Sequence, residues 1–285
     1  MGMNLQWYPG HMTKAKRAME DSIKLVDVIV EIRDARLPYS SANPDLAGMG
    51  KGKKRILVLN KTDLADPRET EKWMAHFRAQ EIIPLAMDAR KRGDCSDILR
   101  QLNELAAEKK AKDLKRGIKN RPARLMIAGI PNVGKSTLIN SLAGRASTKT
   151  GDKPGVTRGL QWIRLNASLE LLDTPGILWP RFEDESVGLK LALMGAIREE
   201  VLPAEELALA GMKMLQERYP QALTDKYGIA GDVSPASLTE LAEKQGLLQK
   251  GAEPDTARAA ARFLDDLKKG RLGRITLESP DSGEE

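Results

Sequence analysis

The sequence predicts an α/β fold: a mostly parallel sheet with helices on both faces, followed by a smaller all-α region. Short apolar runs rich in β-branched residues alternate with helical stretches up to about residue 180. Such alternation is typical of parallel sheets that are covered on both faces. From about residue 183 onward the chain has helical composition and no convincing strand.

The predicted elements divide the chain into three parts. The strands are expected at 26–34, 55–60, 81–87, 123–130, 160–165 and 169–173, and the helices between them at 66–80, 97–116 and 135–144. Further helices are expected within 185–220 and 254–271. The predicted domains are therefore 1–182, the α/β domain, and 183–277, a helical domain, with 278–285 as a flexible acidic tail.

Composition narrows the class of protein. The chain has 285 residues, of which 41% are apolar, so a sizeable core can form. No apolar run reaches the length of a membrane span. One cysteine, Cys95, excludes an internal disulfide and a cysteine-rich zinc module. We expect a cytoplasmic protein with no membrane partner.

The positive charge is concentrated in one block. The net charge is +6, and residues 108–124 hold eight basic and two acidic residues. A block of this kind is commonly a solvated helix face, and it is also the pattern of RNA-backbone contact. Basic residues also occur at 51–55 and 258–274. These surfaces are compatible with RNA, although each has the solvated-face interpretation as its alternative.

A glycine-rich loop lies between the fourth predicted strand and the helix after it. It reads "GIPNVGKST", from Gly129 to Thr137, and fits G-x-x-x-x-G-K-S/T. Glycines let the backbone curl so that amide N–H groups and the helix N-terminus surround phosphates. We expect Lys135 to neutralise the β- and γ-phosphates. The expected nucleotide contacts here are Asn132, Val133, Gly134, Lys135, Ser136 and Thr137.

Oxygen-bearing residues suited to magnesium are found in and after this loop. Ser136 is a direct ligand in this pattern. "DKPGVT" offers the hydroxyl of Thr157, and "LLDTPG" ends a predicted strand with Asp173, which can hold the ion through water. The amide of Gly176 can meet the γ-phosphate. The sequence therefore predicts Mg²⁺ as a cofactor and loops that respond to the γ-phosphate.

A base-recognition motif follows the second predicted strand. Asn60, Lys61, Thr62 and Asp63 read N-K-x-D. A carboxylate at Asp63 can accept hydrogen bonds from N1–H and the amino group of guanine, a donor pair that adenine lacks. The stem of Lys61 can cover the base plane. We expect GTP and GDP as ligands.

The base motif precedes the phosphate motif by about seventy residues, which reverses the usual order. The chain resembles the circularly permuted P-loop GTPases, specifically the ribosome biogenesis GTPase A (YlqF) family. The resemblance covers "WYPGHM", "DARLP" (34–38), "NKTD", "GIPNVGKST", "PGVT" and "DTPG", and continues faintly into "FLDDLKKGRLGRI". It implies that the first three strands correspond to the last three of an ordinary GTPase, with the joint near 104–123.

The resemblance also implies an activity and partners. GTP would be hydrolysed to GDP and phosphate during late assembly of the large ribosomal subunit, with rRNA and ribosomal proteins as partners. A second base contact, usually Ser-Ala, falls on Asp88 and Ala89, where the amide of Ala89 can meet the guanine carbonyl. An acidic residue at Asp88 departs from the family's pattern.

The group that positions the attacking water is not the usual glutamine. Ile177 follows the glycine of "DTPG", and isoleucine cannot bond water. The resemblance implies His11 of "YPGHM" as the catalytic residue, the alternative being a turn histidine satisfied by backbone. Asn132 resembles the asparagine that helps to bind K⁺ in potassium-activated GTPases, or it only shapes the loop. The two proposals are compatible, because a cation would balance charge.

Three other functions stay open at this point. One is a nucleotide-gated scaffold with little turnover, which Ile177 favours and the intact Lys135 disfavours. Another is a permuted GTPase of the small subunit, but that group carries an added RNA-binding barrel and a zinc module for which this chain has no room. The third is a signalling GTPase unrelated to ribosomes.

Overall fold

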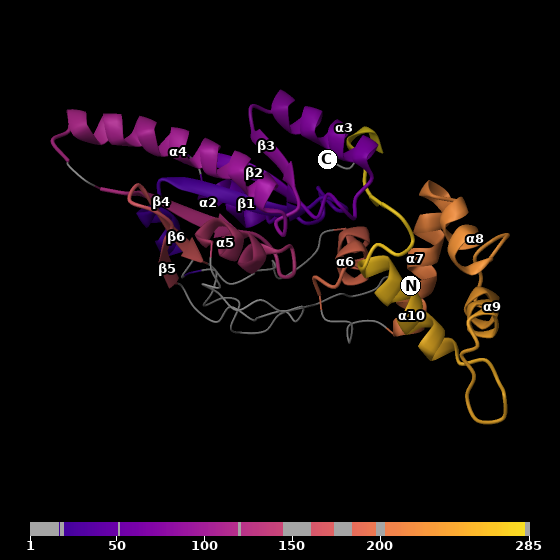
Figure 1. Ribbon diagram of the computed structural model, residues 1–285. Coiled ribbons are helices and arrows are strands. Elements are labelled where there is room, and N and C mark those ends of the chain that lie inside the picture. The colour runs from indigo at the N-terminus through magenta and orange to yellow at the C-terminus, as the bar shows by residue number, and fades with distance from the viewer. Residues whose placement is uncertain are drawn as a thin grey trace.

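The computed structural model describes residues 17, 20–50, 52–118, 121–144, 161–173, 184–197 and 203–282 (Figure 1). His11, Thr157, Gly176 and Ile177 lie outside these ranges, and so does the side chain of Asp173.

Six strands form one mixed sheet, as the sequence predicts. They are β1 (Val28–Asp34), β2 (Lys54–Asn60), β3 (Ile83–Met87), β4 (Ala123–Ala128), β5 (Gln161–Arg164) and β6 (Leu169–Asp173). Their spatial order is β3-β2-β1-β4-β6-β5. All neighbouring pairs are parallel except β5 and β6, which are antiparallel. The two chain halves meet in the middle of the sheet, where β1 pairs with β4.

Helices cover both faces of this sheet. They are α2 (Pro44–Met49), α3 (Pro67–Ala79), α4 (Arg92–Lys115) and α5 (Lys135–Ala143). Alternate strand residues point to opposite faces. Val30 and Ile32 therefore join the core that includes residues of α4 and α5. Ile29 points to the other side and joins a core that includes Leu46 of α2, and Leu57 packs on the same side with Trp73 of α3.

Local sequence explains where α2 and α3 begin. Asp66 precedes α3, and its carboxylate accepts a hydrogen bond from the amide of Arg68 at 2.8 Å. Asn43 caps α2 in the same way. Both helices then start with a proline. Proline lacks the backbone N–H, and at the first helical position that group would have no partner within the helix. The long helix α4 joins β3 to β4 and contains much of the basic block.

The second region is helical, in agreement with the sequence. It contains α6 (Glu185–Leu193), α7 (Ala204–Arg218), α8 (Gln221–Tyr227), α9 (Ala236–Lys244) and α10 (Thr256–Lys268). Figure 1 shows these helices gathered at one end of the sheet. Their buried side chains are continuous with the core beneath α4 and α5. Within the described residues, no helix is both long and apolar enough to cross a membrane.

After α10 the chain returns to the sheet region as an extended stretch, which we call the C-terminal segment (residues 270–282). The amide of Ile275 donates to the carbonyl of Leu64 at 3.0 Å, and the amide of Leu277 donates to that of Arg36 at 2.9 Å. The segment ends in the short 3₁₀ helix η2 (Pro280–Ser282), which contacts α3 (Figure 1).

Residues 278–282 therefore differ from the flexible acidic tail that the sequence predicts. The side chain of Glu278 is fully buried, and its carboxylate accepts hydrogen bonds from the amides of Tyr39 and Ser40 at 2.7 and 3.1 Å. Trp73 donates through Nε1 to the Glu278 carbonyl. Burial raises the pKa of Glu278, although Lys190 opposes this effect. An acidic composition alone did not reveal these long-range donors.

Candidate nucleotide-binding site

The candidate site lies where the parallel strands end. In the sheet register Asp34 pairs with Asn60, and Asn60 pairs with Met87. The polar residues that follow each strand are therefore placed side by side. In sheets of this kind, ligands bind outside the carboxyl ends of the strands. Two of the described loops at this edge are the base loop (residues 60–66), after β2, and the phosphate loop (residues 129–134), after β4.

Two glycines of the phosphate loop allow close backbone approach. A Cβ atom at Gly129 would lie 2.5 Å from the carbonyl oxygen of Ile32. Gly134 has a φ of +101°, and a Cβ there would lie 2.3 Å from Nδ2 of Asn60. Larger residues would thus push the loop away from β1 and from the base loop. These close contacts explain why the sequence pattern has glycine at both positions.

Lys135 begins α5 directly after this loop. Its side chain is buried, and Nζ donates to the carbonyls of Gly129 at 3.2 Å and Ile130 at 2.9 Å. The loop thus curls around its own lysine, beside the N-terminus of α5. Helix N-terminal amides and a lysine ammonium together form a site for anions. This arrangement fits the phosphate groups of a nucleotide.

Asn60 joins the base loop to the phosphate loop. Its Nδ2 donates to the carbonyl of Val133 at 2.7 Å, and its Oδ1 accepts from the amide of Ala89 at 2.9 Å. The sequence predicts that the Ala89 amide meets the guanine carbonyl. In the structure that amide instead donates to Asn60, so a base contact by Ala89 requires a shared or exchanged hydrogen bond.

A cluster of ion pairs formed by Asp34, Arg36 and Lys61 supports the base loop. Lys61 has a φ of +65°, and its Nζ donates to Asp34 Oδ2 at 2.9 Å and to the Asn132 carbonyl at 2.6 Å. Arg36 donates to the same carboxylate through Nε and Nη2. Burial by itself would raise the pKa of Asp34, but the charges of Arg36 and Lys61 outweigh it and hold this pKa well below its usual range.

Asp63 carries one unsatisfied oxygen. Its Oδ1 is buried and accepts no hydrogen bond from the residues that the structure describes. Its Oδ2 accepts from Arg90 Nη2, which also donates to Asp88. A buried carboxylate oxygen without a donor is costly in the free protein. A ligand that brings N–H donors, as guanine does at N1 and its amino group, would satisfy this oxygen.

Two of the expected magnesium ligands, Ser136 and Asp173, lie on described elements. Ser136 is in the first turn of α5, and Asp173 ends β6 next to Ile127 of β4. A hydroxyl and a carboxylate are oxygen donors of the kind that Mg²⁺ prefers. Within the described ranges, no three His, Cys, Asp or Glu side chains form a metal cage. The hydroxyl of Ser136, beside the phosphate loop, fits an ion that phosphate oxygens also hold.

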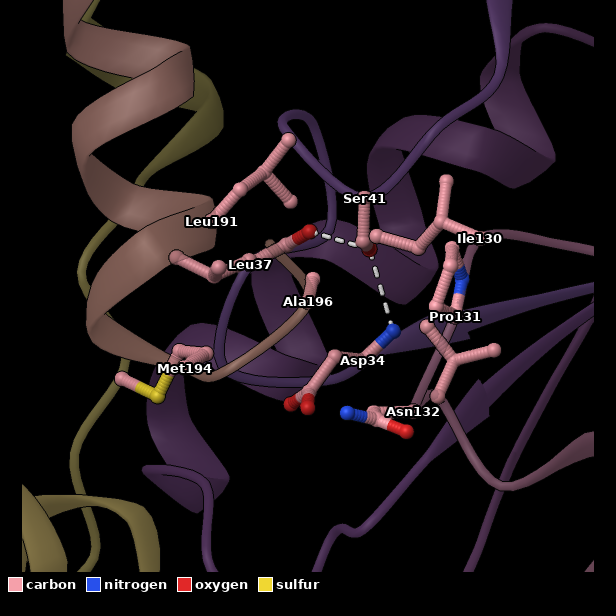
Figure 2. A pocket seen from close by; sticks show the side chains of 10 residues that line it. Asp34, Leu37, Ser41, Ile130, Pro131, Asn132, Leu191, Met194 and Ala196 are labelled. Carbon is pink, nitrogen blue, oxygen red and sulfur yellow. Dashed lines mark hydrogen bonds between the residues drawn. The ribbon is translucent and has the colours of Figure 1, made fainter. Parts of the chain in front are cut away.

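A small cavity lies behind the phosphate loop, against the end of α6. It measures about 10 Å³, enough for one water molecule. Figure 2 shows Asp34 and Asn132 on one side of it and Leu191 and Met194 of the α6 region on the other. Asn132 Nδ2 donates to the carbonyl of Gly195 at 2.6 Å. The residue that the sequence marks as a potassium ligand thus also ties the phosphate loop to the helical region.

The sequence patterns missed three residues that shape the site. Arg36 bonds Asp34 and also donates to the Lys268 carbonyl at 2.9 Å. Arg274 donates to the carbonyls of Thr62 and Ala65 at 2.7 and 2.9 Å, so it faces the base loop. Arg90 bridges two carboxylates. The sequence did hold signals for them: Arg36 lies within "DARLP", Arg274 lies in the basic stretch 258–274, and Arg90 is two residues after Asp88, which follows β3.

Comparisons with known proteins agree with this geometry. A family model described as "50S ribosome-binding GTPase" matches residues 124–209. The chain is 42% identical over 288 residues to the Ribosome biogenesis GTPase A of Priestia megaterium, and the alignment covers 99% of each chain. It is 35% identical over 278 residues to the Thermotoga maritima protein of the same name, covering 97% of this chain and 95% of that protein.

Solved structures show the same likeness. The GNP-bound YlqF of Thermotoga maritima matches with a TM-score of 0.65 and 31% identity, covering 94% of this chain and 99% of the other. A GDP-bound YlqF structure matches with a TM-score of 0.66 and 30% identity, covering 93% and 99%. High identity over nearly the whole length, together with the permuted order of the two loops, shows that this chain belongs to the ribosome biogenesis GTPase A family of GTP hydrolases.

Proposed function

We propose that this GTPase binds and hydrolyses GTP to gate its association with the large ribosomal subunit during late assembly. The observation that carries the nucleotide part is the base loop itself: Asn60 bonds the phosphate loop, and Asp63 has a buried oxygen that receives no hydrogen bond from the described residues. Family membership supports the ribosomal partner. The basic end of α4 supports contact with rRNA.

The chain's own residues have distinct parts in this reaction. Lys135 and the amides at the start of α5 bind the β- and γ-phosphates and balance their charge. Ser136, Thr157 and, through water, Asp173 would hold Mg²⁺, and Gly176 would donate its amide to the γ-phosphate. When bound, Mg²⁺ neutralises charge that develops on the phosphate oxygens. These assignments follow from the motif pattern and from the meeting of β4, β6 and α5.

Two groups are proposed for the hydrolytic step. His11 would accept a hydrogen bond from the attacking water, because Ile177 cannot. Asn132 would bind K⁺ through its side-chain oxygen, the only atom of its amide able to ligate a cation. The Nδ2 contact with Gly195 is compatible with this role, since it uses the other end of the amide.

Residues 1–182 are proposed to act as the GTPase domain and residues 183–277 as a helical domain that responds to it. Two contacts support this coupling. Asn132 of the phosphate loop bonds the Gly195 carbonyl after α6, and Arg36 bonds the Lys268 carbonyl at the end of α10. A change in the conformation of the phosphate loop would thus be transmitted directly to the helical region.

The test is GTP turnover in potassium buffer with and without purified large ribosomal subunits, with sodium buffer and small subunits as controls. We expect slow basal turnover that large subunits accelerate and that His11→Ala abolishes. An Asn132→Ala variant that loses the potassium dependence would support the cation role. Tight GTP binding with no turnover under any condition would instead favour a nucleotide-gated scaffold.

A further inference from the structure

Arg90 occupies an unusual place in the base site. Its guanidinium lies between two carboxylates, with Nη2 donating to Asp63 and both Nε and Nη2 donating to Asp88 at 2.9 and 3.0 Å. The backbone amide of Arg90 adds a third bond to Asp88. The Arg90 side chain is 65% exposed, so the bridge lies at the mouth of the site and not in the core.

Asp88 creates the need for this bridge. It is buried, and as a carboxylate it cannot donate a hydrogen bond to Asp63. Without a cation between them, two carboxylates at one site repel each other. The hydrogen bonds of Arg90 hold the pKa of Asp88 below its usual range, so Asp88 stays charged and keeps the guanidinium in place.

The bridge engages only one of the two carboxylate oxygens of Asp63. Arg90 bonds Oδ2, while Oδ1 stays buried and without a donor among the described residues. Each carboxylate oxygen can accept about two hydrogen bonds. Guanine can therefore donate to both oxygens while Arg90 keeps its own bond. The planar guanidinium thus fixes the orientation of Asp63 before the nucleotide arrives, which reduces the cost of ordering on binding.

We propose that Arg90 is a positioning residue for guanine selectivity, which holds Asp63 in the orientation that reads the base and offsets the charge of Asp88. This inference rests on the proposed role of Asp63 in base recognition. It assigns part of the selectivity for guanine nucleotides to a residue outside the N-K-x-D motif.

The experiment measures dissociation constants of GDP and inosine diphosphate for the full-length protein by titration calorimetry. Inosine diphosphate lacks the amino group of guanine and so leaves one donor missing. The variants are Arg90→Ala, Asp88→Ser and the double variant Asp88→Ser with Arg90→Ala. Arg100→Ala is the matched control, because Arg100 is also 65% exposed and pairs with an exposed aspartate, Asp97.

Arg90→Ala should weaken GDP binding about ten-fold, the effect of losing one hydrogen bond to a charged group. Binding of inosine diphosphate should fall less, so the ratio of the two constants should shrink. The double variant should recover most of the lost GDP affinity, because it removes the carboxylate that repels Asp63 and supplies a hydroxyl donor. Arg100→Ala should match the wild type.

Several outcomes would overturn the proposal. Unchanged GDP affinity in Arg90→Ala would show that Asp63 needs no bridge, and tighter binding would show that Arg90 competes with the base. Equal losses for both nucleotides without recovery in the double variant would indicate a merely structural role. If the wild type binds the two nucleotides equally, the proposed recognition of guanine by Asp63 is itself refuted. That outcome differs from a failure of the role of Arg90 alone.

Discussion

The side-chain amide of Asn60 donates to the carbonyl oxygen of Val133 at 2.7 Å, across 73 positions of the chain. This bond connects the loop that reads the base to the loop that binds the phosphates. Because the same side-chain amide accepts a hydrogen bond from Ala89, one side chain joins the base loop, the phosphate loop and the residues that follow β3. The two loops thus meet in space although the base loop comes before the phosphate loop in the sequence.

Asn60→Ala tests this role. The variant leaves the buried Val133 carbonyl and Ala89 amide without their partners, and each unsatisfied group costs about 1–3 kcal/mol. We expect the free energy of unfolding to fall by about 2–6 kcal/mol and GDP affinity to fall with it. Urea denaturation measures the first. Asn103→Ala, on an exposed position of α4, is the control and should change neither.

Asp34→Asn should alter the acid sensitivity of the fold. The folded-state pKa of Asp34 is depressed, so its ion pairs add stability that is fully present above the unfolded pKa of about 3.9 and is lost as pH falls through the folded value. The variant should lose about 3 kcal/mol at pH 7 and show a shallower decline below pH 4. Urea denaturation at several pH values measures both quantities.

Asp97→Asn is the control for that series. Asp97 pairs with Arg100 at the surface, where both side chains are exposed, and such pairs contribute little. Its pH profile should follow that of the wild type. If Asp34→Asn keeps the wild-type decline in acid, the cluster of ion pairs around Asp34 is not what supports the base loop.

Arg274→Ala should weaken nucleotide binding from outside the motifs. Arg274 holds two carbonyls of the base loop, those of Thr62 and Ala65. Releasing them frees the loop, so we expect GDP affinity to fall about three- to ten-fold, while turnover at saturating GTP stays unchanged. Calorimetry and a saturation curve separate the two effects. Lys269→Ala is the control, because it removes an exposed charge nearby, and it should leave GDP affinity unchanged. If Arg274→Ala binds GDP as tightly as the wild type, Arg274 does not support the base loop.

Gly211→Ala should destabilise the helical region. A Cβ there would lie 2.7 Å from Leu193 Cδ2 and 3.0 Å from Phe263 Cε1, where α7 packs against α6 and α10. Overpacking costs about 1–3 kcal/mol, which exceeds the gain of about 1 kcal/mol in helix propensity. Thermal unfolding followed by circular dichroism measures the net loss.

Gly93→Ala provides the comparison within α4, where a Cβ meets nothing within 4 Å. That variant should be stabilised by up to about 1 kcal/mol, because only the helix propensity changes. Stabilisation of both variants would mean that α7 can move away from its neighbours without cost.

The sequence alone predicted the fold class and the two loops. Alternating apolar runs gave the six strands, since strand and helix periodicity depend on near neighbours. The N-K-x-D and glycine-rich motifs revealed the base and phosphate loops for the same reason: each function resides in a few consecutive residues. Even the permutation was visible, because it is a statement about order along the chain.

Only the tertiary structure decided which distant side chains complete these loops. Arg90 meets Asp63 because β2 and β3 are neighbours in register, and Arg274 meets Thr62 because the chain returns from α10 to the sheet. Glu278, acidic and near the end of the chain, is buried because amides 238 and 239 residues earlier in the sequence donate to it. Such contacts depend on the packing of whole elements, and no local pattern encodes them.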